Sequence, residues 1–145
     1  ILIYEGGKTI GMSLTEVYLP HKFAMLAYLF VSPGHQGLGL GKLLCQELFD
    51  FFDRSSVLKW LLVEAEAGPE RFYKKLGFTT LSIQYLSPHY DDMQSTPMAL
   101  MLHSKLGQSA PSKAQLWEIV KHIFSESYYL ADNDPRLEQQ RKCIL

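Results

Sequence analysis

Cysteine is scarce in this sequence, and no long apolar run is present. Two of the 145 residues are cysteine, Cys45 and Cys143. Two cysteines so far apart are not typical of a disulfide framework, and we expect a reducing, cytoplasmic setting. No stretch approaches the ~18 consecutive apolar residues of a membrane span, and no secretory signal is visible. These absences argue against a membrane partner.

An excess of charge of either sign is also missing. Lys and Arg total 14, Asp and Glu total 15, and the formal net charge is -1. A general nucleic-acid binder normally shows a basic excess, so no nucleic-acid partner is expected. The composition, 47% hydrophobic and 20% charged, is typical of a globular protein of about one domain.

The sequence does not begin with methionine. Ile1 already stands in an apolar stretch typical of a strand. We therefore expect further sequence upstream, which would carry additional elements of the same domain.

Apolar periodicity predicts the elements that follow. Alternating or buried-strand patterns cover 1–4, 9–18, 23–31, 58–63, 78–86 and 98–103, with a hairpin turn at 5–8. Apolar residues recur at helical spacing over 39–53, and a short helix over 70–76 stops at Gly77. The order is β-β-β-α-β-α-β-β, a mixed α/β (α+β) layer.

A different pattern begins near residue 107. Residues 107–113 have the composition of a linker, and 114–129 form an amphipathic helix with Ser112 as its candidate cap. The final polar stretch is compatible with a short helix or a loose tail.

Glycine is concentrated in one place, between the third strand and the first helix. Gly34, Gly37, Gly39 and Gly41 stand within eight positions. A Walker loop requires Ser or Thr after its lysine, but Leu43 follows Lys42. A dinucleotide fingerprint requires G-x-G-x-x-G, but Gly37, Gly39 and Gly41 are spaced by two, and Lys42 stands where the third glycine should be. Neither pattern fits.

The segment still has the physical properties of an anion site. Glycine removes the Cβ atoms that would keep a pyrophosphate away from backbone N–H groups. The first turn of a helix offers unpaired N–H donors and a positive potential, to which Lys42 adds a full charge.

Two motifs together resemble one known family. Gln36-x-x-Gly39-x-Gly41 is similar to the acetyl-CoA-binding segment of the GCN5-related N-acetyltransferases, the GNAT superfamily. The segment RFYKKLGF, residues 71–78, resembles a later motif of that family. The resemblance covers residues 1–106 and implies a mixed, mostly antiparallel sheet with flanking helices. On this basis residues 1–106 are an N-terminally incomplete acetyltransferase domain, and 107–145 add a linker, an extra helix and a tail.

The resemblance implies a cofactor site for acetyl-CoA as co-substrate, with no metal. The end of the third strand would pair with the pantetheine arm and polarise the thioester carbonyl. The glycine-rich segment would hold the pyrophosphate. The residues concerned are Leu29, Phe30, Val31, Gln36, Gly37, Leu38, Gly39, Leu40, Gly41 and Lys42. Tyr73 matches the family tyrosine that contacts the CoA sulfur and protonates the leaving thiolate; the alternative is a core aromatic.

This sequence departs from the family pattern before Tyr73. Many members carry Asn seven residues before that tyrosine, where this chain has Glu66, with Glu64 close by. Either carboxylate is a candidate general base, directly or through water, because an amine must lose a proton as it attacks. Alternatively, each glutamate is a solvated charge or one that orders the loop. A dedicated base is also not required, because other members of the family use only water and backbone groups for this step.

Other polar residues near these motifs have open roles. His35 either contacts phosphate or is simply exposed. Arg71, Lys74 and Lys75 form a solvated face or approach the 3′-phosphate of CoA.

The resemblance implies transfer of an acetyl group from acetyl-CoA to a primary amine by direct attack in a ternary complex. The near-neutral charge favours a small-molecule acceptor over a basic protein tail. The rival interpretation is a catalytically silent acyl-CoA-binding sensor or regulatory domain. The helix at 114–129 either supports such a role by docking or homodimerisation, or packs on its own domain.

Overall fold

The computed structural model describes all residues, Ile1–Leu145, which form two compact units. Unit 1 comprises Ile1–Val63 and His103–Gln108, and unit 2 comprises Glu64–Leu102 and Ser109–Leu145. Both contain strands and helices, and all but one of the strand pairs within them are antiparallel. The predicted mixed α/β fold, with a mostly antiparallel sheet and flanking helices, is confirmed.

Unit 1 is built on a strand meander. β1 (Leu2–Glu5) and β2 (Lys8–Tyr18) form an antiparallel hairpin, and β3 (Phe23–Val31) pairs antiparallel with β2. Gly6 and Gly7 have φ values of 55° and 78°, the left-handed backbone that a tight hairpin requires. β4 (Trp60–Ala65) runs parallel to β3, from Phe23↔Trp60 to Leu26↔Val63.

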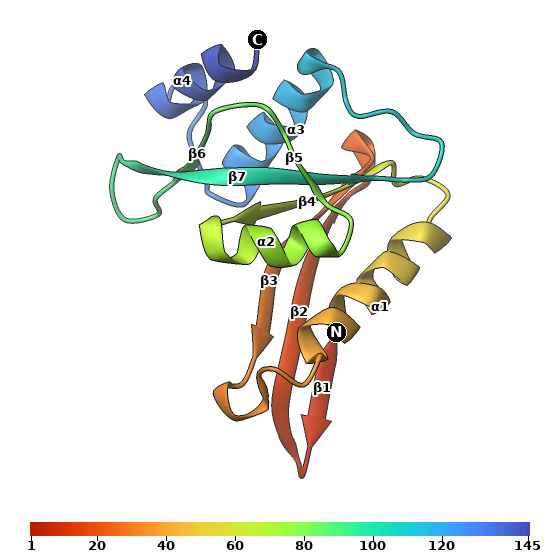
Figure 1. Ribbon diagram of the computed structural model, residues 1–145. Helices are drawn as coiled ribbons and strands as arrows, with labels where there is room; N and C mark the ends of the chain where they lie inside the picture. Colours follow the sequence, from red (N-terminus) through yellow and green to blue (C-terminus); the bar gives the residue numbers. More distant parts are fainter. The chain divides into compact units, whose positions relative to one another are not determined.

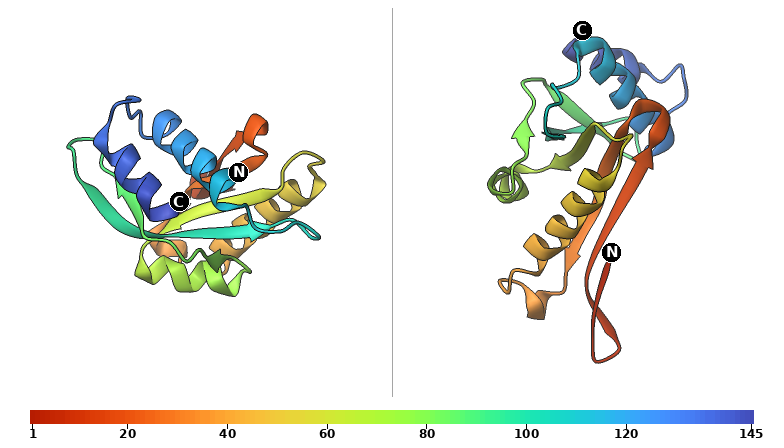
Figure 2. Two further views of the ribbon diagram at one scale, coloured as in Figure 1. Left: turned by 90° about the horizontal axis from the view of Figure 1, so that it is seen from above. Right: turned by 90° about the vertical axis from the view of Figure 1, so that its right-hand side faces the viewer.

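Helix α1 (Leu40–Arg54) makes the crossover between the parallel strands β3 and β4. Its buried residues, Leu44, Cys45, Leu48 and Phe52, recur at helical spacing on one face. That face packs on β2 and β3, along which the helix lies in Figure 1 and in the right-hand view of Figure 2. Burial of each leucine and phenylalanine side chain in this set contributes about 1.5–3 kcal/mol to stability. The helix thereby places its N-terminus at the end of β3.

Unit 2 begins inside β4 and continues through α2 (Ala67–Lys75), β5 (Thr79–Thr80), β6 (Tyr85–Pro88) and β7 (Ser95–Ser104) as far as Leu102. Both β5 and β6 pair antiparallel with β7. The single strand predicted over 78–86 is therefore wrong, because it is two short strands. The amide of Ile83 turns back to the carbonyl of Leu81, 2.9 Å away, and this tight turn breaks the strand.

The short helix α2 starts earlier than the predicted residue 70. Glu66 has an extended backbone and occupies the N-cap position without a side-chain capping bond, and the Glu70 amide donates to the Glu66 carbonyl at 2.9 Å. Pro69 lies in the first turn, where a missing N–H removes no intrahelical bond.

The C-terminal part of unit 2 contains α3 (Lys113–Glu126) and α4 (Pro135–Ile144). Ser112 caps α3 as predicted, in a capping box with Gln115. The apolar face of α3 is buried, and α3 contacts α4, which in turn contacts β6 (Figure 2, left). The final polar stretch, for which the sequence allowed either a short helix or a loose tail, thus contains a helix. None of the helices has both the length and the apolar character needed to cross a membrane.

Candidate functional site

The glycine-rich segment connects β3 to α1 as an exposed loop. A 3-10 turn (Pro33–His35) is followed by Gln36 in extended backbone, then by Gly37 and Gly39 with φ values of 78° and 81°. Gly39 is the N-cap of α1, and no side chain caps the helix there. The first-turn N–H groups of Leu40, Gly41 and Lys42 therefore face outward without an intrahelical acceptor.

The glycines at 37 and 39 are required by backbone conformation rather than by packing. A Cβ placed on either would meet no atom within 4 Å, but their left-handed φ is strained for other residues. The space above the loop is open at both positions. Gly34 has equally open surroundings without a left-handed φ. The structure thus distinguishes Gly37 and Gly39 from Gly34.

The end of β3 extends beyond its parallel neighbour. Leu29, Phe30 and Val31 pair with Ser13, Met12 and Gly11 of β2. The opposite edge of β3 faces β4, and the last parallel pair between them is Leu26↔Val63. β4 ends two residues later, at Ala65, so it does not reach as far as Leu29. Backbone groups on that edge of a strand can bond an extended ligand.

Two side chains fix the loop to the strands. Gln36 Nε2 donates to the Val31 carbonyl at 3.2 Å. The His35 ring lies between Ser32 and Glu5, with Nδ1 2.7 Å from Ser32 Oγ and Nε2 2.7 Å from Glu5 Oε2. Because both ring nitrogens have protein partners, His35 acts as a clamp between β1 and the loop.

Tyr73 lies in unit 2, on the last turns of α2. It is 7% exposed, and its ring packs against Phe72 and Phe78 at centroid distances of 5.2 and 5.6 Å. The amide of Phe78 bonds the Tyr73 carbonyl at 3.1 Å, after Gly77 turns the chain with a φ of 105°. The Leu-Gly-Phe part of the motif therefore closes the helix against its own tyrosine.

The two lysines beside Tyr73 are exposed. Lys74 pairs with Glu70 at 2.8 Å along the helix, and Glu70 also accepts from Thr80 at 2.6 Å. These two partners keep the pKa of Glu70 below its ordinary value. This arrangement is typical of a solvated helix face.

Glu64, one of the two candidate bases, is surrounded by hydroxyl groups. Tyr85 Oη donates to its Oε1 and Tyr128 Oη to its Oε2, while Ser87 Oγ lies 3.5 Å from Oε2. Ser87 Oγ and Tyr128 Oη are also hydrogen bonded, 2.8 Å apart. Burial, followed by the adjacent Glu64 charge, raises the pKa of both tyrosines, so the phenols hold their protons.

Sequence reasoning missed Tyr85, Ser87 and Tyr128. Tyr85 and Ser87 are spaced by two on β6, which places both on one face of the strand. Nothing in the sequence pattern links that face to Tyr128, more than forty residues later.

Glu66, the other candidate base, is exposed and lines a cavity of about 360 Å³ in unit 2. The remaining lining residues come from β6, the β6–β7 loop, β7 and the segment that follows α3: Ser87, Pro88, His89, Tyr90, Asp91, Asp92, Thr96, Met98 and Tyr128. Tyr128 and Ser87 connect this cavity to Glu64 through the hydrogen bonds above.

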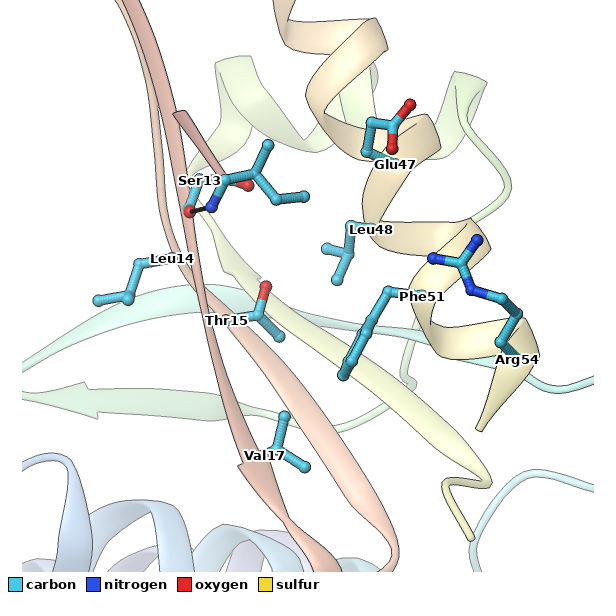
Figure 3. A pocket seen from close by; sticks show the side chains of 9 residues that line it. Ser13, Leu14, Thr15, Val17, Glu47, Leu48, Phe51 and Arg54 are labelled. Atoms are coloured by element: carbon cyan, nitrogen blue, oxygen red, sulfur yellow. Dashed lines mark hydrogen bonds between the residues drawn. The ribbon is translucent and has the colours of Figure 1, made fainter. Parts of the chain in front are cut away.

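A second cavity, of about 400 Å³, lies in unit 1 (Figure 3). Its wall is formed by the N-terminal Ile1, by Ser13, Leu14, Thr15 and Val17 from β2 and by Glu47, Leu48, Phe51 and Arg54 from α1. No residue predicted for the cofactor or for catalysis lines it.

The structure therefore places the predicted residues in two groups. Leu29, Phe30, Val31 and the loop of residues 36–42 lie together in unit 1. Tyr73, Glu64 and Glu66 lie in unit 2. No group of three or more His, Cys, Asp or Glu side chains is arranged to hold a metal ion.

Comparison with known proteins identifies the family and the fold. Residues 1–80 match the model of the acetyltransferase (GNAT) domain. A Bacteroides thetaiotaomicron protein assigned to the GNAT family shares the fold with a TM-score of 0.69 at 20% identity, over 90% of this chain and 72% of that one. Comparison with curated protein sequences gave no match.

Two further solved structures are similar. The ribosomal-protein-S18-alanine N-acetyltransferase of Escherichia coli gives a TM-score of 0.58 at 25% identity, over 75% of this chain and 69% of that one. An aminoglycoside 6′-N-acetyltransferase, solved with coenzyme A, gives a TM-score of 0.56 at 13% identity, over 75% of this chain and 73% of that one. Since the family model matches more than half of the sequence, this chain belongs to the GNAT acetyltransferase family.

Proposed function

We propose that this chain transfers an acetyl group from acetyl-CoA to the primary amine of a small molecule. The observation that carries the proposal is the loop at the N-terminus of α1. Two glycines with left-handed φ precede an uncapped helix start, with open space above them. Membership of the GNAT family supplies acetyl-CoA as the anionic ligand such a loop would hold.

In the proposed complex the cofactor occupies unit 1. The N–H groups of residues 37–42 bind the pyrophosphate, aided by the helix dipole and by the exposed Lys42. The pantetheine arm lies along Leu29, Phe30 and Val31, beyond the end of β4. A backbone N–H of Phe30 or Val31 then stabilises the oxyanion that forms at the thioester carbonyl.

The reaction is direct attack of the amine on the thioester carbon. The new C–N bond forms as the C–S bond breaks, and Tyr73 gives its hydroxyl proton to the departing thiolate. A phenol, with an ordinary pKa of about 10, suits a donor to a developing thiolate. Glu64 or Glu66 accepts a proton from the amine.

The relatives do not point to one acceptor. One is named for the alanine of a ribosomal protein and another for an aminoglycoside. The nearly balanced charge of this chain, -1 overall, gives little attraction for a strongly basic protein tail. This favours a small amine. The two free cysteines are compatible with a reducing, cytoplasmic setting.

We further propose that residues 1–106 carry the acetyltransferase domain and that 107–145 are an addition to it. The family model ends at residue 80. α3 and α4 both follow the stretch of residues 105–112, which contains no helix or strand.

The function is tested by two measurements on the same preparation. Calorimetric titration reports binding of CoA, and release of free thiol from acetyl-CoA across a panel of primary amines reports transfer. Binding with amine-dependent thiol release is the expected result. Binding without release on any amine would favour an acyl-CoA sensor, and no binding would overturn the proposal.

A further inference from the structure

The cavity of unit 1 has no part in the proposed acetyl transfer. It measures about 400 Å³ and lies between β2 and α1 (Figure 3). The pantetheine arm is proposed for the edge of β3 that faces β4, whereas β2 lies on the other side of β3 in the sheet. Cavities of a few hundred Å³ are typical of sites for small molecules. This cavity is therefore a candidate for a second ligand.

A buried hydroxyl group without a partner faces the cavity. Ser13 is 3% exposed, and its Oγ makes no hydrogen bond, although its backbone is paired with Ile1 at 2.8 and 2.9 Å. A Cβ on Gly11 would lie 3.4 Å from Leu44 of α1, so the side chain of Ser13, two residues later, also faces that helix. A buried hydroxyl that has lost its water partners costs free energy. Ser13 thus offers an unused donor and acceptor to a molecule in the cavity.

Two side chains of opposite charge line the cavity from α1. Glu47 and Arg54 are both exposed, and neither forms an ion pair. Seven residues separate them, which is two helical turns on the same face and about 10 Å along the helix axis. Figure 3 shows Glu47 at the same end of the cavity as Ser13, and Arg54 toward the other end. The carboxylate and the guanidinium therefore offer two separate positions for charged groups.

The wall between these charges is apolar. Leu48 and Phe51 point from α1 toward Thr15 and Val17 of β2 (Figure 3). Phe51 is 43% exposed and Val17 is 41% exposed, so part of this apolar surface is in contact with solvent. Removing it from water would favour binding of an apolar group. Along its length the cavity thus offers a carboxylate, an apolar surface and a guanidinium.

We propose that this cavity binds a short linear zwitterion, in which an apolar stretch separates one ammonium group from one carboxylate. ω-Amino acids and apolar dipeptides belong to this class. The ammonium donates to the Glu47 carboxylate and to Ser13 Oγ, and the ligand carboxylate accepts from the Arg54 guanidinium, whose fork suits a carboxylate. The apolar stretch covers Phe51. This inference does not rest on the proposed acetyl transfer.

The test is calorimetric titration of 6-aminohexanoate into the full chain. Hexanoate and hexylamine are the matched controls, because each has the same carbon chain and only one of the two charges. 6-Aminohexanoate should bind on the order of tenfold more tightly than either, since each lacks one charge-assisted hydrogen bond. Equal affinity for 6-aminohexanoate and either control, or no binding of it at millimolar concentration, would overturn the proposal.

A titration with alanyl-leucine identifies the source of the ligand. Tighter binding of this dipeptide than of 6-aminohexanoate would assign short peptides, whose amide can also use the Ser13 hydroxyl. Weaker binding would assign ω-amino acids. Both results support a zwitterion site.

Substitutions at the two ends of the cavity test the geometry. Arg54→Gln and Glu47→Gln should each raise the Kd for 6-aminohexanoate on the order of tenfold. Asp53→Asn removes an exposed charge of α1 that does not line the cavity, so its Kd should match wild type. Equal Kd values for all three variants would show that the ligand lies elsewhere.

Ser13→Ala distinguishes a ligand-binding hydroxyl from a structural one. Because Ser13 Oγ has no partner in the protein, its removal should not lower the melting temperature, while the affinity for 6-aminohexanoate should fall several-fold. A lower melting temperature with unchanged affinity would overturn the role of Ser13. CoA binding and thiol release should be unchanged in every variant, since no cavity residue is assigned to either. Failure of this site would therefore leave the proposed function intact.

Discussion

The side-chain amide of Gln36 donates a hydrogen bond to the carbonyl oxygen of Val31, 3.2 Å away. Val31 is the last residue of β3, and Gln36 begins the glycine loop, so this bond ties the proposed pyrophosphate site to the strand end proposed for pantetheine. The glutamine of the motif thus has a structural reason for its place before the glycines.

Replacing Gln36 with Ala should loosen the loop and weaken CoA binding. Loss of one hydrogen bond of about 1 kcal/mol corresponds to a roughly fivefold rise in Kd. The measurement is calorimetric titration with CoA. Gln46→Ala removes an exposed glutamine from α1 and should leave Kd unchanged. Equal Kd values for the two variants would show that the Gln36–Val31 bond does not order the site.

Tyr73→Phe should lower kcat on the order of 100-fold without raising the KM for acetyl-CoA, because it removes a proton donor used only as the thiolate departs. The ring contacts with Phe72 and Phe78 remain, so the melting temperature should change little. Tyr4→Phe, at a 62% exposed tyrosine of β1, is the control. A wild-type kcat in Tyr73→Phe would leave Tyr73 as a packing residue only.

The two cysteines should differ sharply in reactivity. Cys45 is buried in α1, and burial raises its pKa to about 11, whereas Cys143 is half-buried near the chain end. At pH 8 a thiol with that pKa is only about one part in a thousand thiolate, and the thiolate is the reactive form. A thiol reagent should therefore modify Cys143 quickly in the folded protein, and it should modify both cysteines in denaturant. Rapid modification of both in the native state would contradict the packing of α1.

Asp134 should stabilise unit 2 in a pH-dependent way. The hydrogen bond from the Arg136 guanidinium lowers the pKa of Asp134 in the folded protein. The stability that Asp134 contributes is therefore complete above the ordinary Asp pKa of about 4. It is lost as the pH falls from there through the lowered pKa of the folded state. Asp134→Asn leaves Arg136 buried without its counter-charge and should reduce the free energy of unfolding by about 3 kcal/mol at neutral pH.

Urea unfolding at pH 7 and pH 3 measures this effect. The difference in unfolding free energy between wild type and Asp134→Asn should narrow at pH 3, because the Asp134 carboxylate is then protonated in the unfolded chain while Arg136 still favours its charged form in the native protein. Asp132→Asn, at an exposed position in the same segment, should match wild type at both values. A gap that does not change with pH would mean that capping of α4, and not the charge pair, provides the stability.

Local patterns predicted the elements around the glycine loop well. The apolar run of β3 and the spacing of Leu44, Leu48 and Phe52 on α1 are signals that a strand and an amphipathic helix require. Gly39 was recognised as part of the Gln36-x-x-Gly39-x-Gly41 motif, and the structure adds its left-handed backbone at the start of α1. The family resemblance implied acetyl-CoA as the donor, and the match of the family model over residues 1–80 confirmed the family.

The surroundings of Glu64 could not be predicted in this way. They depend on hydrogen bonds to Tyr85, 21 residues away, and to Tyr128, 64 residues away. Such long-range pairs leave no periodic signal in one sequence. The strand predicted over 78–86 failed for a related reason, since the turn at Leu81 depends on a backbone bond to Leu100 of β7.

The most direct test of the account is calorimetric titration of CoA into wild type, Gly39→Glu and Gly34→Glu. Gly39 has a φ of 81° and caps α1, while Gly34 lies in the same loop without that conformation, and a Cβ at either meets open space. A carboxylate at position 39 would strain the backbone and repel the pyrophosphate, so Kd should rise on the order of 100-fold, from the loss of about two charge-assisted hydrogen bonds. The Gly34 variant should stay within a few-fold of wild type. An unchanged Kd in Gly39→Glu would contradict the claim that this loop holds the cofactor.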